Sequence, residues 1–233
     1  MTGKVAVSWS GGKDSCLALE LVRERGLDVA CLVCMLDEHG ERTRSHGQHP
    51  RLIEAQARSL GVELRLPRAG WSDYEREFVT TLRGLHSSGI TQVVFGDIDL
   101  DDHRAWEERV CAEAGLEAVL PLWQWDRLRV VDEVLHRGID AICVAVNEAY
   151  LPASFCGRRY DRSFIADLPA TVDACGERGE FHSLVVDAPG FREAIPAFVR
   201  QVHRVEVGDG PGGGRYAFAE LALASDLNAH PDP

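Results

Sequence analysis

Short apolar runs alternate with segments of helical periodicity over the first 150 residues of the chain. The apolar runs predict strands at Val5–Ser8, Val29–Leu36, Val62–Leu66, Gln92–Phe95, Leu116–Leu120 and Ile139–Val146. The segments between them predict helices at Ser15–Arg25, Pro50–Leu60, Asp73–Leu85, Arg104–Ala114 and Leu128–Arg137. Strands that alternate with amphipathic helices are typical of βαβ units, whose crossovers are right-handed. We therefore expect an α/β fold with a doubly wound, mostly parallel sheet.

The pattern changes after Tyr150, where proline and glycine interrupt the chain. Further strands are predicted at Ser183–Val186, Val202–Val207 and Tyr216–Leu223. We interpret this part as a smaller C-terminal α+β lobe, with a main domain at residues 1–150 and the lobe at residues 151–233. The segment Gly208–Gly213 formally matches G-x-G-x-x-G, but a strand follows it, which predicts a hairpin loop. The polar tail Asn228–Pro233 is expected to fray.

Composition and charge narrow the classes of function. The net charge of −12 argues against a broad nucleic-acid surface, because phosphate backbones repel such a protein. The seven cysteines are an odd number and lie mostly in apolar runs, which predicts buried thiols and a cytoplasmic protein. No signal peptide precedes Lys4, and no apolar stretch approaches the ~20 residues that a membrane span requires. Cys31 and Cys34 are three apart in a predicted strand and point to opposite faces, which argues against a shared zinc ion.

A glycine-rich segment, Ser10-Gly11-Gly12-Lys13-Asp14-Ser15, joins the first predicted strand to the first helix. Two glycines allow a ligand to approach the backbone, and the free N–H groups of the helix N-terminus favour an anion. The alternative is a plain strand-to-helix turn, which needs only one glycine. The segment is not a Walker A loop, which would require glycine at Val7 and Ser or Thr at Asp14. We expect it to lie at the surface and pack little, so that Lys13→Ala or Gly12→Val would abolish phosphate binding without unfolding the protein.

The strand, the S-G-G-x-D-S segment and the helix resemble the PP-loop of ATP pyrophosphatases, which cleave ATP between the α and β phosphates. Three more segments extend the resemblance: Gly96-Asp97-Ile98, Pro121-Leu122-Trp123 and Cys175–Ser183 with its G-E-x-G-E-F motif. Together they make the chain similar to the diphthine–ammonia ligase family, which forms an amide from a carboxylate, ammonia and ATP. The resemblance implies ATP and Mg²⁺ as cofactors, with metal ligands left open. The residues that it implies for ATP binding are Ser10, Gly11, Gly12, Lys13, Asp14, Ser15, Met35 and Gly96.

The candidate catalytic residues are Lys13, Asp97, Glu177, Glu180 and His182. Lys13 would stabilise the charge that grows on departing pyrophosphate. Asp97 follows a buried strand at its carboxyl end, where α/β sheets bind ligands. The two glutamates could hold Mg²⁺ or position ammonia, or they could merely form an acidic turn that caps a strand. Trp123 is the tryptophan that we expect near a ligand.

The leading hypothesis is a ligase that adenylates a carboxylate, releases pyrophosphate and transfers ammonia. This sequence departs from the family pattern at one position. Family members that act on diphthine carry glutamate where this chain has His182, and this difference concerns the acceptor. The chemistry therefore carries over better than the substrate, and the acceptor is a small-molecule or protein-borne carboxylate. The alternatives are a PP-loop enzyme of tRNA thiolation or modification and a non-catalytic sensor of adenine nucleotides. The first would want a reactive cysteine pair and a basic RNA surface, and neither is visible. A homodimer stays open.

Overall fold

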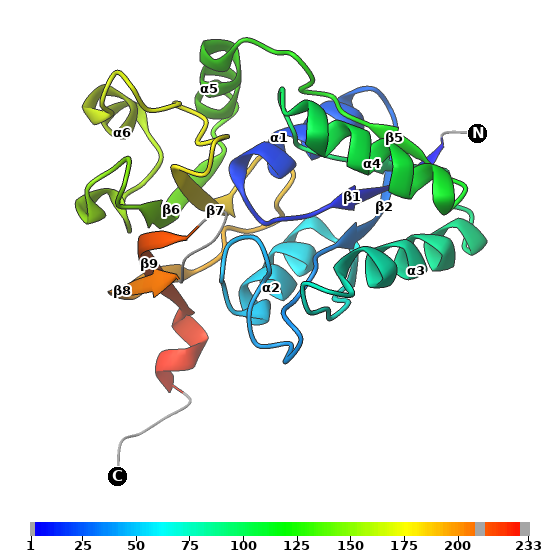
Figure 1. The fold of residues 1–233 in the computed structure, drawn as a ribbon, viewed down its shortest axis with the longest axis horizontal. Helices are drawn as coiled ribbons and strands as arrows, with labels where there is room; N and C mark the ends of the chain where they lie inside the picture. The colour runs from blue at the N-terminus through cyan, green and yellow to red at the C-terminus, as the bar shows by residue number, and fades with distance from the viewer. Residues whose placement is uncertain (1–2, 208–212, 229–233) are drawn as a thin grey trace.

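The computed structural model describes residues 3–207 and 213–228. A five-stranded sheet, in which every pairing is parallel, lies on one side of the molecule (Figure 1). Its strands, in the order β3-β2-β1-β4-β5, are β1 (Lys4–Ser8), β2 (Asp28–Val33), β3 (Glu63–Arg65), β4 (Gln92–Val94) and β5 (Glu117–Val119). All five were predicted from the apolar runs, and the ends differ by at most three residues.

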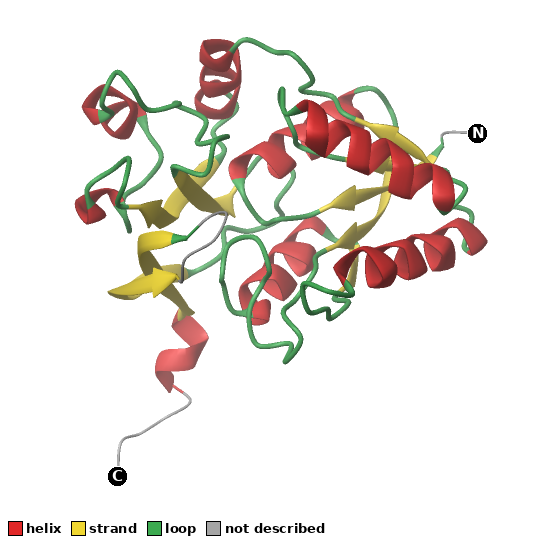
Figure 2. Cartoon of the chain, in the orientation of Figure 1, coloured by secondary structure: helices red, strands yellow, loops and turns green. Residues whose placement is uncertain are grey.

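Helices cover both faces of this sheet (Figure 2). On one face lie α1 (Lys13–Glu24) and α2 (Pro50–Leu60), and on the other lie α3 (Tyr74–Ser87) and α4 (Asp101–Glu113). Side chains of a strand alternate between the faces. Val5 and Val7 accordingly join the core under α1, whereas Ala6 joins the core under α3 and α4. The doubly wound α/β fold is confirmed.

A second, four-stranded sheet is antiparallel and has the order β7-β6-β9-β8. Its strands are β6 (Asp140–Asn147), β7 (Phe181–Asp187), β8 (Ala197–Val207) and β9 (Gly214–Leu223). The helices α5 (Arg127–His136) and α6 (Arg162–Asp167) and the 3₁₀ turns η1 (Ala153–Phe155) and η2 (Ala224–Asn228) accompany it. Strands β8 and β9 pair as the predicted hairpin, but residues 208–212 of its loop lie outside the described residues, as do residues 229–233 of the tail.

One expectation about this sheet is wrong. The run Ile139–Val146 was expected to complete the parallel sheet, yet it forms β6 in the middle of the second sheet. A strand buried on both faces is continuously apolar in either kind of sheet, so its pattern does not reveal its partners. The partners of β6 are β7 and β9, which come later in the chain. The domain boundary at residue 150 stays a prediction.

The two sheets share one core. A continuous cluster of buried apolar side chains contains Leu17 of α1, Leu52 of α2, Val130 of α5 and Leu184 of β7. The C-terminal lobe therefore packs directly on the helix that follows the glycine-rich segment. Among the described residues, no helix has both the length and the apolar character needed to cross a membrane.

Candidate functional site

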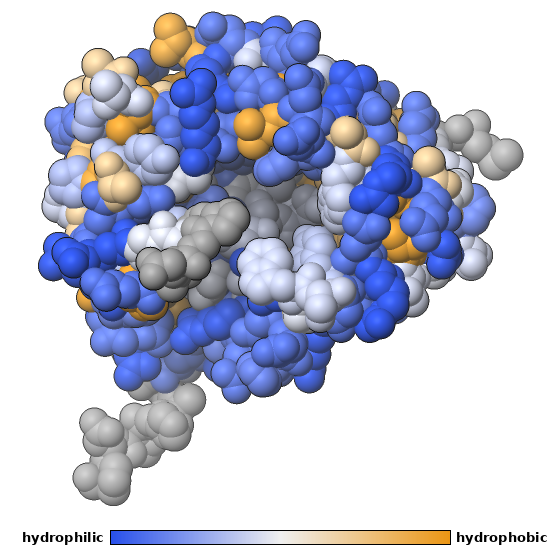
Figure 3. Space-filling view, viewed as in Figure 1, coloured by the Kyte–Doolittle hydropathy of each residue, from blue (hydrophilic) through white to orange (hydrophobic). Residues whose placement is uncertain are grey.

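A cavity of about 530 Å³ opens at the carboxyl ends of β1 and β4, where the strand order reverses. Loops after β1, β2 and β4 and the start of the C-terminal lobe line it. Figure 3 shows the hollow near the centre of this face, among mostly hydrophilic residues. Most of the sequence-predicted site residues meet here: Ser10, Lys13, Asp14, Ser15, Met35, Gly96, Asp97, Glu177 and His182.

The two glycines of the glycine-rich segment have no room for a side chain. Gly11 has a φ of +80°, and a Cβ on it would lie 2.7 Å from the Ile53 side chain. A Cβ on Gly12 would lie 2.7 Å from the ring of His46 and 3.0 Å from the Ser183 carbonyl oxygen. Gly12 is the N-cap of α1 and provides no side-chain cap. The Lys13 N–H donates to Ser183 Oγ at 3.2 Å, so the N–H groups of Asp14 and Ser15 are the ones in this first turn that can meet an anion.

This segment is packed against the C-terminal lobe. The Gly11 carbonyl accepts from the Val185 N–H at 2.8 Å and from the Gln56 amide at 3.0 Å. The same Gln56 amide also donates to the Val185 carbonyl at 2.7 Å. The expectation that the segment lies at the surface and packs little is therefore wrong. The sequence did not show this because the partners are 45 or more positions away.

Lys13 is only 2% exposed. Its Nζ donates to Asp14 Oδ2 at 2.8 Å and to the Cys175 carbonyl at 2.5 Å, and the rings of Tyr160 and Phe181 lie within 5.4 Å. Burial by itself would lower the pKa of Lys13, but the charge of Asp14 raises it above its usual value. The ammonium group is therefore a fixed charge that ties the glycine-rich segment to the C-terminal lobe.

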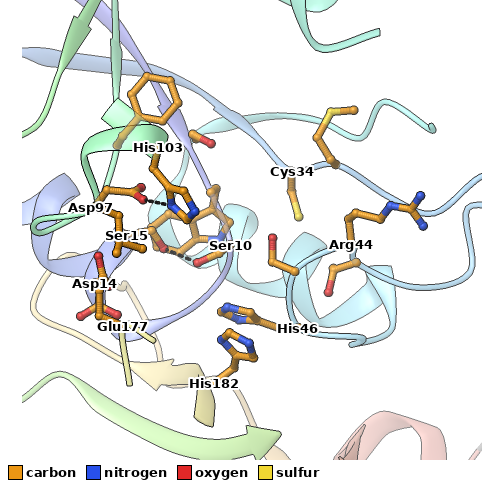
Figure 4. Close-up of a pocket in the computed structure, with 18 of the residues that line it drawn as sticks. Ser10, Asp14, Ser15, Cys34, Arg44, His46, Asp97, His103, Glu177 and His182 are labelled. Carbon is orange, nitrogen blue, oxygen red and sulfur yellow. Dashed lines mark hydrogen bonds and ion pairs between the residues drawn. The ribbon is translucent and has the colours of Figure 1, made fainter. Parts of the chain in front are cut away.

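An acidic wall borders the glycine-rich segment in the cavity. Asp97 accepts from Nδ1 of His103 at 2.8 Å (Figure 4). The carboxyl group of Glu107 also adjoins Asp97. Burial alone would raise the pKa of Asp97, but the hydrogen bonds from His103 and Glu107 hold it below its usual value. For Glu107, burial and the neighbouring charge of Asp97 raise the pKa to about 10.

The structure separates the two candidate glutamates of the C-terminal lobe. Glu177 lines the cavity, and its Oε1 accepts from the Ile98 N–H at 3.0 Å. Burial raises the pKa of Glu177 to about 7. Glu180 is only 2% exposed, and its carboxylate accepts from the backbone N–H groups of Asp173 at 3.2 Å and Arg178 at 2.9 Å. These contacts favour the alternative left open by the sequence, in which Glu180 holds the loop before β7.

His182 stacks on His46 with ring centroids 4.8 Å apart and an interplanar angle of 22° (Figure 4). His182 comes from β7, whereas His46 comes from the loop between β2 and α2. Burial lowers the pKa of His182 to about 4, with a smaller contribution from the charge of Lys13. Burial also holds the pKa of His46 well below its usual value. Both rings are therefore neutral at pH 7, and the ring of His46 lies beside Gly12.

Two further predictions concern close approach and strand faces. A Cβ on Gly96 would lie 2.8 Å from the backbone nitrogen of Ser15, so the turn after β4 has to pass directly over the start of α1. Cys31 and Cys34 belong to the two different core clusters, which confirms that they point to opposite faces.

Sequence reasoning missed several residues of the cavity: Arg44, Trp71, Tyr74 and Trp106. Trp71 is 81% exposed, and the guanidinium of Arg44 lies 4.1 Å from its ring centroid. No motif marks these residues, although an aromatic residue and an arginine in a loop region after a strand are a signal worth testing. Trp123, which we expected near a ligand, stacks with Arg104 and is not among the described residues that line the cavity.

Comparisons with known proteins identify relatives of this chain. The diphthamide synthase N-terminal domain matches residues 3–118, and the diphthamide synthase C-terminal domain matches residues 126–205. The diphthine–ammonia ligases of Bos taurus and Homo sapiens are 26% and 25% identical over 220 and 221 residues, which is 82% of this chain and 82% of each of those proteins. The diphthine–ammonia ligase of Schizosaccharomyces pombe is 26% identical over 80% of this chain, but the match spans only 34% of that longer protein.

Proposed function

This chain belongs to the diphthamide synthase family, and we propose that it is an ATP-dependent ligase that joins ammonia to a carboxylate. The observation that carries the proposal is a phosphate cradle at the N-terminus of α1, where Ser10 and Ser15 place their hydroxyl groups in a cavity with an acidic wall. The cradle suits the phosphates of a nucleotide, and the acidic wall suits a cationic or proton-bearing nucleophile.

ATP would bind with its phosphates over the segment from Ser10 to Ser15. Ser10 Oγ and Ser15 Oγ lie 3.1 Å apart and offer two hydroxyl groups beside the N-terminus of α1. Met35 and Gly96 line the neighbouring part of the cavity, where the nucleoside would lie. Asp14 Oδ1 is buried without a hydrogen-bond partner in the described residues, which fits a ligand of Mg²⁺. A bound Mg²⁺ would neutralise phosphate charge there.

The chain's own groups then act on two steps. In the first, an oxygen of the acceptor carboxylate attacks the α-phosphorus and pyrophosphate departs. The N–H groups of α1 and the fixed charge of Lys13 stabilise the charge that grows on the pyrophosphate. In the second step, ammonia attacks the acyl carbon and AMP leaves. Asp97 and Glu177 belong to the acidic wall and lie on the side of the site where ammonia would enter.

The acceptor would lie toward the C-terminal lobe. The relatives are named for diphthine, and a diphthine-like carboxylate is the first acceptor that we propose. His182 would then influence which acceptor is used, because it is neutral and stacked at the edge of the site. All seven cysteines are buried and free, which supports a cytoplasmic location. Dimerisation stays a prediction.

The test is product analysis. The protein is incubated with ATP, Mg²⁺ and ammonium, with either a diphthine-bearing protein or a panel of small carboxylates. Chromatography should show AMP and pyrophosphate that require both ammonium and an acceptor. ADP and phosphate as the main products would overturn the proposal, and so would the absence of any turnover with every acceptor.

A further inference from the structure

Three side chains on the acidic wall form a chain of hydrogen bonds. His103 and Glu107 are four residues apart on α4, so they share one face of the helix. Asp97, which follows β4, lies between them. Its Oδ1 is 2.8 Å from Nδ1 of His103, and it adjoins the carboxyl group of Glu107, whose Oε2 is buried without another partner among the described residues. All three line the cavity (Figure 4 labels Asp97 and His103).

The protonation states follow from burial. Glu107 is 4% exposed, and a pKa of about 10 keeps it neutral at pH 7, so its O–H donates to Asp97. Asp97 stays ionised and accepts a second hydrogen bond from the Nδ1–H of His103. Nδ1 of the imidazole therefore carries the proton and Nε2 carries the lone pair. This is the order of groups that orients an imidazole as a base.

The negative charges around His103 also favour a proton on its ring, because they raise its pKa. The hydrogen bond to Asp97 raises the pKa of His103, burial opposes it, and the charges of Asp97, of Glu177 from the C-terminal lobe and of Asp102 on the same helix add to the increase. The side chain of His103 is 59% exposed, so a ligand in the cavity can reach it. Of the other two imidazoles of the cavity, His46 is buried and His182 is half-buried, and neither has a carboxylate partner among the described residues.

We infer that His103 is the general base that removes a proton from the nitrogen nucleophile, with Asp97 and Glu107 as positioning residues. The inference rests on the proposed ligase function. As the nitrogen of ammonia forms its bond to the acyl carbon, the bond from that carbon to the phosphate oxygen breaks and AMP leaves with the electron pair. The proton lost by nitrogen moves to Nε2 of His103, which leaves a neutral amide.

The test compares four variants in single-turnover amide formation with the acceptor found by product analysis. His103→Gln should be about 10²- to 10⁴-fold slower with ammonium at pH 8. Its deficit should be much smaller with hydroxylamine, because the less basic nitrogen of this nucleophile gives a more acidic adduct, which loses its proton to water more readily. Glu107→Gln retains a donor toward Asp97 and should be nearly as active as the wild type, whereas Glu107→Ala should be slower. His86→Gln, an exposed histidine on α3 outside the cavity, is the matched control.

The pH profile supplies a readout that a structural role would not move. A base must be neutral, so the wild-type rate should rise as pH increases through the raised pKa of His103. In Asp97→Asn this rise of the rate should occur at lower pH. The titration midpoint of the His103 imidazole resonances, followed by NMR, should move to lower pH as well. The inference would be overturned, and the ligase function left standing, by either of two results. One is an equal loss of rate with ammonium and hydroxylamine in His103→Gln, and the other is a rise of rate with pH that is unchanged in Asp97→Asn. If wild-type protein released no AMP with any acceptor, the proposed function would fall, and the inference with it.

Discussion

At the scale of single residues, Lys13 has a structural role that its motif does not suggest. The motif places a lysine in a phosphate loop, but this side chain lies inside the protein, against Asp14 and the Cys175 carbonyl. A sequence pattern identifies the residue type at a turn, whereas the direction of a long side chain depends on partners far along the chain. Cys175 is 162 positions away.

We predict that Lys13→Met lowers the free energy of unfolding by roughly 2–4 kcal/mol, because it leaves Asp14 unpaired and a buried carbonyl without its donor. Urea unfolding measures this. Lys4→Met, at an exposed position of β1, is the matched control and should change stability little. If Lys13→Met bound no ATP but unfolded like the wild type, the structural role assigned to Lys13 would be wrong.

Glu180 and Glu177 should respond oppositely to the same change. In Glu180→Gln the new amide nitrogen cannot accept from a backbone N–H, so we expect a loss of about 1–3 kcal/mol in stability with turnover per folded molecule retained. Glu177→Gln keeps an acceptor for the Ile98 N–H and should instead lower turnover. Thermal unfolding and AMP release on the same preparations decide between the roles. A Glu180 variant that was stable but inactive would restore it to the catalytic set.

At the scale of elements, the sequence identified the strands and helices of the parallel sheet but not every partner. Alternating apolar and helical patterns are local, and so they locate β1 to β5 and α1 to α5. The pairing of β6 with β7 and β9 depends on contacts between distant segments, which no local pattern records. The candidate site was predicted in part for the same reason. Asp97 and Glu177 stand in recognisable motifs, but Glu107 lies in the middle of a helix, and only the structure brings it to Asp97.

The contact between the loop before β7 and the turn after β4 should make stability depend on pH. Glu177 has a folded-state pKa of about 7, above its usual 4.5, so the folded protein binds its proton more tightly than the unfolded chain. Its contribution to stability is therefore complete below pH 4.5 and is lost as pH rises through 7. Glu177→Gln lacks this loss. The free energy of unfolding of the variant, relative to that of the wild type, should therefore increase by about 2–3 kcal/mol from pH 5 to pH 8. Chemical unfolding at both pH values tests this, and a constant difference would refute it.

At the scale of the whole molecule, the two sheets depend on one another. Their shared core and the hydrogen bonds from Val185 and Gln56 to Gly11 mean that the C-terminal lobe completes the phosphate cradle. We predict that the full chain unfolds in a single transition by both fluorescence and circular dichroism. A fragment of residues 1–125 should neither unfold cooperatively nor bind ATP, because it lacks β7. A folded, ATP-binding fragment would show that the lobes are independent.

The central claim is that an acceptor carboxylate attacks the α-phosphorus of ATP. The most direct measurement uses an acceptor whose carboxylate oxygens are both ¹⁸O, with ammonium, ATP and Mg²⁺, and determines the mass of the AMP that is released. Attack by the carboxylate leaves one acceptor oxygen on phosphorus, so the AMP should carry one ¹⁸O and the amide product should retain the other. Unlabelled AMP, or label recovered only in inorganic phosphate, would contradict the account.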